Sequence, residues 1–258
     1  MKTPFVLIPL YIYPLERAWE PLLEAARAHR EVHFVAIINP DNGPGRGRLP
    51  DGSYTAALSR LAEEPNISTL GYVYCSYGQR AVEAIQADMD IYRGWCRQGQ
   101  LAVGGVFFDE TPSDPAYVEY MATLAHYAKE TWRRDMGDGE GHGGREATVV
   151  YNPGVVVGPG FFFRGADYVV VFEASEDQWN RLRKLGQDLR RMDDRTRPKA
   201  VAIIHSSRGG SSGSGARKVL KQTRSLGLTG VYVTDQQEGG YTRWPAAWMK
   251  FAKAVSQC

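Results

Sequence analysis

Val32-His-Phe-Val-Ala-Ile-Ile38 is apolar at nearly every position, and Tyr168-Val-Val-Val-Phe172 repeats this character later in the chain. A strand that is covered on one face alternates apolar and polar residues, whereas a parallel strand that is covered on both faces is apolar almost throughout. The two stretches therefore predict buried parallel strands. Parallel strands need crossover connections between them, and these are usually helices.

Outward from these stretches, the chain alternates in order between β-rich runs and amphipathic patterns. The predicted strands cover residues 5–13, 32–39, 68–75, 102–109, 147–152, 168–174, 199–206 and 229–235. The predicted helices cover residues 19–29, 54–64, 80–97, 116–133, 177–189, 216–226 and 245–256. This order indicates an α/β fold, a (β/α)8 TIM barrel formed by a single domain over residues 1–258. A doubly wound open sheet is the alternative, but no Gly-x-Gly-x-x-Gly loop follows the first strand.

Three segments interrupt the regular pattern. Residues 153–164 are rich in Gly, Pro and Phe and lack a helical period, so the helix there is expected to be missing or very short. Residues 135–144 and 208–215 are rich in Gly, and they predict mobile loops. The first of these loops precedes a strand and the second follows one, so only the second is expected on the active-site face.

Composition excludes several classes of function. Lys and Arg total 31 against 29 Asp and Glu, a formal charge of +2 that does not suggest a nucleic-acid partner. No apolar run approaches the roughly 18 residues that a membrane helix needs, so no membrane span is expected. Nothing in the sequence calls for more than one copy of the chain, and we expect a monomer.

Cysteine and histidine usage argues against a metal or a cofactor. The three cysteines, Cys75, Cys96 and Cys258, are too few and too scattered for a disulfide framework or a zinc knuckle. No second histidine stands at ligand spacing from His205, the histidine at the end of a predicted strand. We therefore expect neither metal nor cofactor. The sequon Asn66-Ile-Ser68 would suit a secreted or cell-surface domain.

The active site of a (β/α)8 barrel lies at the carboxyl ends of its strands. Polar and aromatic residues at the predicted strand ends are Tyr11, Tyr13, Asn39, Tyr74, Asp109, Glu110, Asn152, Glu173, His205 and Asp235. The three carboxylates Asp109, Glu110 and Glu173 come from strands four and six and are the candidate catalytic residues. Each could instead cap a helix or pair with an arginine.

Barrel geometry brings the carboxylates of strands four and six to about 5 to 9 Å, a separation at which two carboxyl groups cleave a glycosidic bond. One group donates a proton to the leaving oxygen, and the other stays ionised toward the sugar ring. Neighbouring strand residues point to opposite faces, so only one of Asp109 and Glu110 is expected to act directly. Strand alternation does not decide which one.

The other strand-end residues are candidates for substrate binding. Sugar rings pack on aromatic faces, which suits Tyr11, Tyr13 and Tyr74, and Tyr72 and Tyr77 belong to the same aromatic group. Asn39 and Asn152 suit hydroxyl or N-acetyl recognition, and His205 and Asp235 complete the set. Core packing, turn formation and strand-end hydrogen bonds remain open as alternative roles.

Seven sequence blocks, taken in order, resemble the spherulin-4-like family, which forms glycoside hydrolase family 135. The blocks are Pro9-Leu-Tyr-Ile-Tyr-Pro14, Ile38-Asn-Pro40 with Gly43-Pro-Gly45, Thr69-Leu-Gly-Tyr-Val-Tyr74, Asp90-Ile-Tyr92 with Trp95, Gly105-Val-Phe-Phe-Asp-Glu110, Asn152-Pro-Gly154 and Val170-Val-Phe-Glu173. The resemblance implies a fungal, secreted or cell-surface (β/α)8 glycosidase. Its polysaccharide substrate would be galactosaminogalactan, cleaved internally at α-1,4-linked N-acetylgalactosamine.

The same resemblance implies that Asp109 is the nucleophile or base, Glu173 the general acid and Glu110 an assisting carboxylate. A retaining outcome is expected, although a neighbouring N-acetyl group could itself act as the nucleophile. Two rival functions remain open. One is a wall-associated carbohydrate-binding protein that does not cleave, and the other is a metal-dependent hydrolase that uses the carboxylates as ligands.

Overall fold

The computed structural model describes residues 4–134, 146–181, 192–208, 213–237 and 240–258. Eight parallel strands close into a barrel in the order of the chain, and β8 pairs with β1. The strands are β1 (Phe5–Leu10), β2 (Phe34–Ile38), β3 (Ile67–Tyr74), β4 (Gly105–Asp109), β5 (Thr148–Tyr151), β6 (Tyr168–Ser175), β7 (Ala200–His205) and β8 (Gly230–Val233). The predicted (β/α)8 barrel is confirmed.

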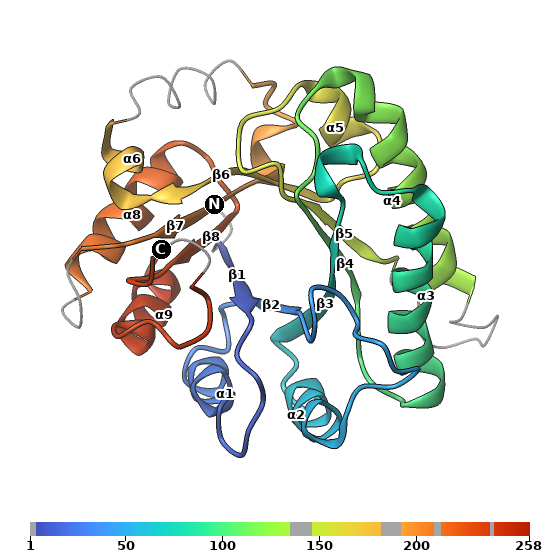
Figure 1. The fold of residues 1–258 in the computed structure, drawn as a ribbon. Coiled ribbons are helices and arrows are strands. Elements are labelled where there is room, and N and C mark those ends of the chain that lie inside the picture. The colour runs from blue at the N-terminus through green and yellow to red at the C-terminus, as the bar shows by residue number, and fades with distance from the viewer. Residues whose placement is uncertain (1–3, 135–145, 182–191, 209–212, 238–239) are drawn as a thin grey trace.

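Helices surround the barrel on its outer side (Figure 1). They are α1 (Glu20–Ala28), α2 (Gly52–Ala62), α3 (Val82–Gln98), α4 (Val118–Arg134), α5 (Pro159–Phe163), α6 (Glu176–Arg181), α8 (Ser214–Ser225) and α9 (Trp248–Ser256). None of the described helices is long and apolar enough to cross a membrane.

The structure describes only part of the segments where the sequence pattern is interrupted. The connection after β5 contains only the short helix α5, as predicted from its Gly, Pro and Phe content. The predicted helix 177–189 is described up to Arg181, and its remainder lies outside the described residues. The predicted loop 135–144 lies outside them too, as do residues 209–212 of the loop 208–215.

The first strand is shorter than predicted. β1 ends at Leu10, which pairs with Ile38 at the end of β2, although the sequence pattern continued to residue 13. The next residues of the neighbouring strand are Asn39 and Pro40, and a proline has no backbone N–H with which to extend a ladder. The chain around Tyr13 therefore leaves the sheet.

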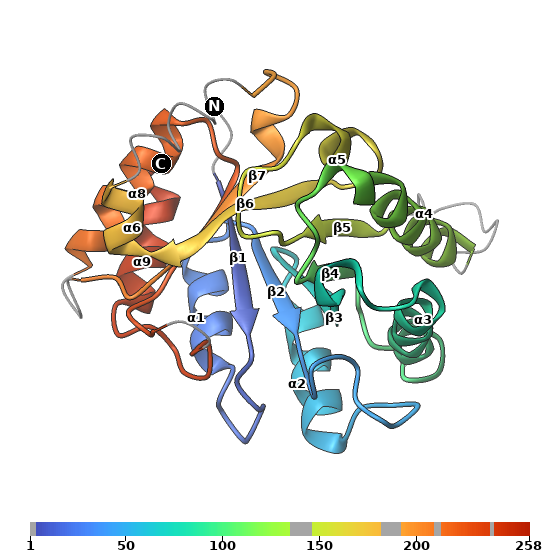
Figure 2. The same ribbon diagram turned by 45° about the horizontal axis from the view of Figure 1, so that its top comes forward.

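Pairing registers decide which strand residues point into the barrel. Tyr72 lies beside Phe107, and Phe107 lies beside Val150. The alternate residue Phe108 packs against Tyr151, whose hydroxyl donates to the carbonyl of Met121 on α4 at 2.8 Å. Phe108 therefore faces the helical layer and Phe107 faces the interior. Figure 2 shows the strands running together inside the ring of helices.

Candidate active site

Two carboxylates enter the barrel interior from β4 and β6. Asp109 is the last residue of β4 and shares the inward face of Phe107. Strict alternation from Val170, which pairs with Val201, would turn Glu173 outward. A register shift between Val170 and Phe172 pairs Glu173 with Ile203 instead, on the face of Val201. This β-bulge re-aims the Glu173 side chain toward Asp109.

Asn152, which follows β5, bridges the two carboxylates. Its Nδ2 donates to Asp109 Oδ1 at 2.7 Å and to Glu173 Oε2 at 2.5 Å. Because both bonds share one nitrogen, the two oxygens lie no more than about 5 Å apart. The Gly154 N–H donates to Asn152 Oδ1, and a backbone N–H can only donate, so the amide orientation is fixed.

Three tyrosines pack around the carboxylate pair. The Tyr241 hydroxyl donates to Glu173 Oε1 at 2.6 Å, and the Tyr72 hydroxyl hydrogen-bonds Asp109. The Tyr11 ring contacts the rings of Tyr72 and Tyr241 edge to face, with centroids 5.6 and 5.7 Å away. The three tyrosines and the two carboxylates thus form one contiguous cluster.

Burial and hydrogen bonding act in opposite directions on Asp109. Burial raises the pKa of its carboxyl, while hydrogen bonds from Tyr72, the Glu110 N–H and Asn152 hold that rise back. These three donors are best satisfied by an ionised carboxylate. Burial, followed by the charge of Asp109, also raises the pKa of Glu110.

Glu110 does not continue the strand, contrary to the expectation that Asp109 and Glu110 alternate across one. β4 ends at Asp109, and Glu110 adopts a left-handed backbone conformation with φ of 49°. Its carbonyl accepts a hydrogen bond from the Tyr77 N–H at 2.7 Å. The reversal keeps Glu110 close enough for the charge of Asp109 to act on its carboxyl.

The remaining predicted residues make other contacts at the strand ends. Tyr13 is 46% exposed and donates to Asp51, the N-cap of α2, and Asn39 accepts from the Gly43 N–H. The Arg80 guanidinium stacks over the Tyr74 ring. His205 forms a hydrogen bond with the Ser206 hydroxyl, and Asp235 forms an ion pair with Arg243. The structure thus gathers Tyr11, Asp109, Asn152 and Glu173 with Glu110 close by. The catalytic and substrate-binding roles of all ten residues stay predictions.

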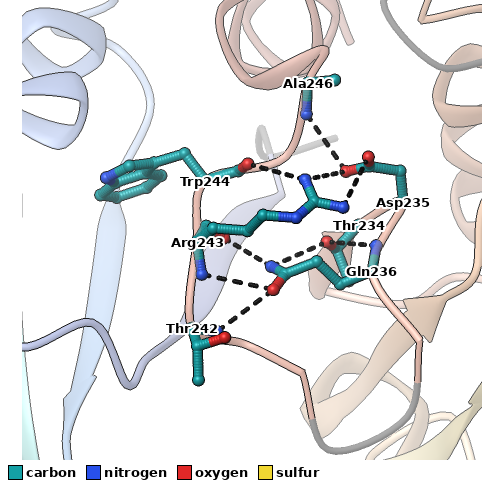
Figure 3. A network of polar contacts seen from close by, with 7 residues as sticks. All are labelled: Thr234, Asp235, Gln236, Thr242, Arg243, Trp244 and Ala246. Carbon is teal, nitrogen blue, oxygen red and sulfur yellow. Dashed lines mark hydrogen bonds and ion pairs between the residues drawn. The ribbon is translucent and has the colours of Figure 1, made fainter.

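The strand-end pattern does not identify Tyr241 as a site residue, because Tyr241 lies six residues beyond Asp235, the predicted end of the last strand. Gln236 shapes its loop: the amide oxygen accepts from the N–H groups of Thr242 and Arg243, and the amide nitrogen donates to the Arg243 carbonyl. Figure 3 shows this network beside the ion pair of Asp235 and Arg243. An aromatic residue in a polar, glycine-containing segment after the strand was the available signal.

Within the described part of the chain, no group of three or more His, Cys, Asp or Glu side chains is placed to hold a metal ion. The two interior carboxylates have Asn152, Tyr72 and Tyr241 as hydrogen-bond donors.

Comparisons with known proteins agree with this architecture. The model of "Spherulation-specific family 4" matches residues 5–255. Spherulin-4 of Physarum polycephalum is 28% identical over 236 residues, which are 91% of this chain and 64% of that relative's length. The chain therefore spans less than two thirds of this relative.

Solved structures give two further likenesses. Aspergillus clavatus Sph3, determined in complex with GalNAc, is 31% identical with a TM-score of 0.83, and the match covers 99% of both chains. A Bacteroides thetaiotaomicron chitinase is 11% identical with a TM-score of 0.56 and covers 98% of this chain and 96% of its own, which shows a shared fold. The chain belongs to the spherulation-specific family 4, as the order of its sequence blocks predicted.

Proposed function

We propose that the chain is a glycoside hydrolase that cuts internally at α-1,4-linked N-acetylgalactosamine in a galactosaminogalactan-type exopolysaccharide. The observation that carries the proposal is the Asn152 bridge, which holds Asp109 and Glu173 oxygens within about 5 Å of each other. Retaining glycosidases place their two carboxyl groups about 5 to 5.5 Å apart. A related protein of known structure was determined with GalNAc bound, which supports this sugar as the ligand.

The hydrogen bonds suggest how the two carboxylates divide the work. Asp109 receives three donors, so it is suited to stay ionised and face the developing positive charge of the sugar ring. Glu173 would carry the transferable proton. That proton fits Oε1, because the Tyr241 hydroxyl there can accept a hydrogen bond, whereas the Asn152 amide nitrogen at Oε2 can only donate.

Two forms of the retaining reaction are compatible with this site. In one, Asp109 attacks the anomeric carbon and forms a covalent glycosyl intermediate that water hydrolyses. In the other, the N-acetyl carbonyl oxygen attacks and Asp109 orients the amide. De-N-acetylated polymer separates them, because the second form requires the acetyl group. An enzyme that acts on such a polymer works at the cell surface or outside the cell, and we propose that location.

The direct test is release of reducing ends from galactosaminogalactan by the wild-type chain and by Asp109→Asn and Glu173→Gln. Glu119→Gln is a matched control, because Glu119 is an exposed carboxylate that pairs with Arg164 on the outer layer. We expect release by the wild type and the control and a loss of at least about 100-fold in the two site variants. Equal release by all four proteins would refute the assignment.

A carbohydrate-binding protein that does not cleave is the second candidate function. The family relationship and the tyrosine cluster of Tyr11, Tyr72 and Tyr241 beside the carboxylates fit this role as well. Tight binding of the polymer by the wild-type chain without any release of reducing ends would select it.

A further inference from the structure

Tyr77 stands exposed beside the carboxylate site. Its side chain is 62% exposed, and no aromatic residue is more exposed in the parts of the chain that the structure describes. The Tyr77 N–H donates to the carbonyl of Glu110. Burial and the charges of Glu110, Asp109 and Glu173 raise the pKa of its hydroxyl, so the ring lies within the electrostatic reach of all three carboxylates.

The backbone that presents Tyr77 is strained. Ser76 and Tyr77 both have left-handed conformations, with φ of 47° and 52°. Bulky residues rarely adopt this conformation, and they keep it only where the surrounding structure imposes it. A strained backbone under an exposed aromatic ring indicates that the position of the ring matters for function rather than for core packing.

Contacts beneath the loop hold it in place. A Cβ atom on Gly78, which has φ of 86°, would lie 2.5 Å from the Tyr117 ring, so only glycine allows this close packing. Arg80 forms an ion pair with Asp88 on α3 at 2.7 Å, and the Tyr120 hydroxyl donates to the Arg80 carbonyl at 2.6 Å. The loop is anchored to α3 and α4 while the Tyr77 ring stays uncovered.

From this geometry we propose that Tyr77 is the aromatic platform of a sugar-binding subsite next to the catalytic carboxylates. The ring packs against the apolar C–H face of one N-acetylhexosamine residue of the polymer. This inference rests on the proposed function and adds the residue that positions the neighbouring sugar. Three nearby carboxylates disfavour an anionic ligand, and a flat ring with preset orientation binds a sugar face at little entropic cost.

The test compares variants that remove or keep the ring. Tyr77→Asn removes it while keeping a residue type that tolerates the left-handed conformation, and Tyr77→Phe keeps it. Phe163→Ala is a control at an aromatic residue that is 48% exposed at the end of α5, where Arg195 from the segment before β7 covers its ring. Near-ultraviolet circular dichroism and melting temperature check the fold of each variant.

We expect Tyr77→Asn to raise KM for N-acetylgalactosamine oligosaccharides about tenfold and to change kcat much less. Tyr77→Phe should stay within about threefold of the wild-type KM, since the platform is retained. Calorimetric titration with the same oligosaccharides should show the same order of affinities without any need for turnover.

Two outcomes would overturn the platform alone: a wild-type chain that binds or cleaves while Tyr77→Asn behaves identically, or an equal loss in Tyr77→Phe and Tyr77→Asn. A wild-type chain that neither binds nor cleaves these oligosaccharides would overturn both the platform and the proposed function.

Discussion

Removing one hydroxyl from the site, in Tyr241→Phe, should slow catalysis without weakening substrate binding. The Tyr241 hydroxyl donates to Glu173 Oε1 at 2.6 Å. The ring itself packs between Tyr11 and Tyr232, with centroids 5.7 and 6.2 Å away, so phenylalanine should keep its place. The substitution therefore tests the hydrogen bond alone.

The size of the effect follows from the type of hydrogen bond. As Glu173 gives up its proton it becomes a carboxylate, to which the Tyr241 hydroxyl donates. Hydrogen bonds to charged groups contribute about 1.5 to 3 kcal/mol, and each 1.36 kcal/mol is about tenfold in rate. Glu173 is partly exposed, which favours the lower half of that range. We expect kcat to fall by about 13- to 45-fold, whereas KM should stay within about twofold because the hydroxyl positions Glu173 rather than the sugar.

The assay is initial-rate release of reducing ends over a range of oligosaccharide concentrations. Tyr232→Phe is a matched control, because this buried tyrosine also loses a hydroxyl, which hydrogen-bonds Thr234 rather than a carboxylate. A kcat for Tyr241→Phe within twofold of the wild type, or an equal loss in Tyr232→Phe, would refute the positioning of Glu173 by Tyr241.

Three further predictions follow from the site. Burial raises the pKa of the Asp109 carboxyl above its ordinary value of 3.8, so the folded state binds the carboxyl proton more tightly than the unfolded state does. The folded state therefore loses stability as the pH rises from 3.8 through the raised pKa. The gain in melting temperature from Asp109→Asn should therefore be larger at about pH 7 than near pH 4, and a gain independent of pH would contradict this account. Gln236→Leu removes the hydrogen bonds that shape the Tyr241 loop, so kcat should fall about as much as in Tyr241→Phe. Unchanged kinetics would show that the loop keeps its conformation without the Gln236 side chain. A chelator such as EDTA should leave reducing-end release within about twofold of the untreated rate, and loss restored by a divalent cation would favour the metal-dependent alternative.

The sequence predicted the barrel well because buried parallel strands leave a strong apolar signal. The runs around Phe34 and Tyr168 both form strands near their predicted bounds. Strand ends were less accurate, since the apolar pattern around Tyr11 and Tyr13 continued where the pairing with β2 stopped at Ile38. Hydrophobic patterns record burial, whereas a strand ends where its neighbour stops offering backbone partners.

Side-chain directions in the site depended on features that composition does not reveal. Glu173 faces Asp109 because a bulge after Val170 shifts the register of β6. The apolar residues of β6 around the bulge are ordinary strand residues, so their types do not predict it. Asn152 could be recognised as a strand-end amide, but its contact with both carboxylates arises only when β4, β5 and β6 are placed together. Tyr241 reaches the site from a loop whose path is set by side-chain hydrogen bonds.

Mass spectrometry of the soluble products formed from galactosaminogalactan over time tests internal cleavage by the Asp109 and Glu173 pair most directly. With the wild-type chain we predict a growing ladder of oligomers spaced by one N-acetylhexosamine, as expected for internal cleavage. Glu173→Gln should bind the polymer and give no ladder. Absence of the ladder with folded wild-type protein, or an equal ladder from Glu173→Gln, would contradict a glycosidase that works through the Asp109 and Glu173 pair.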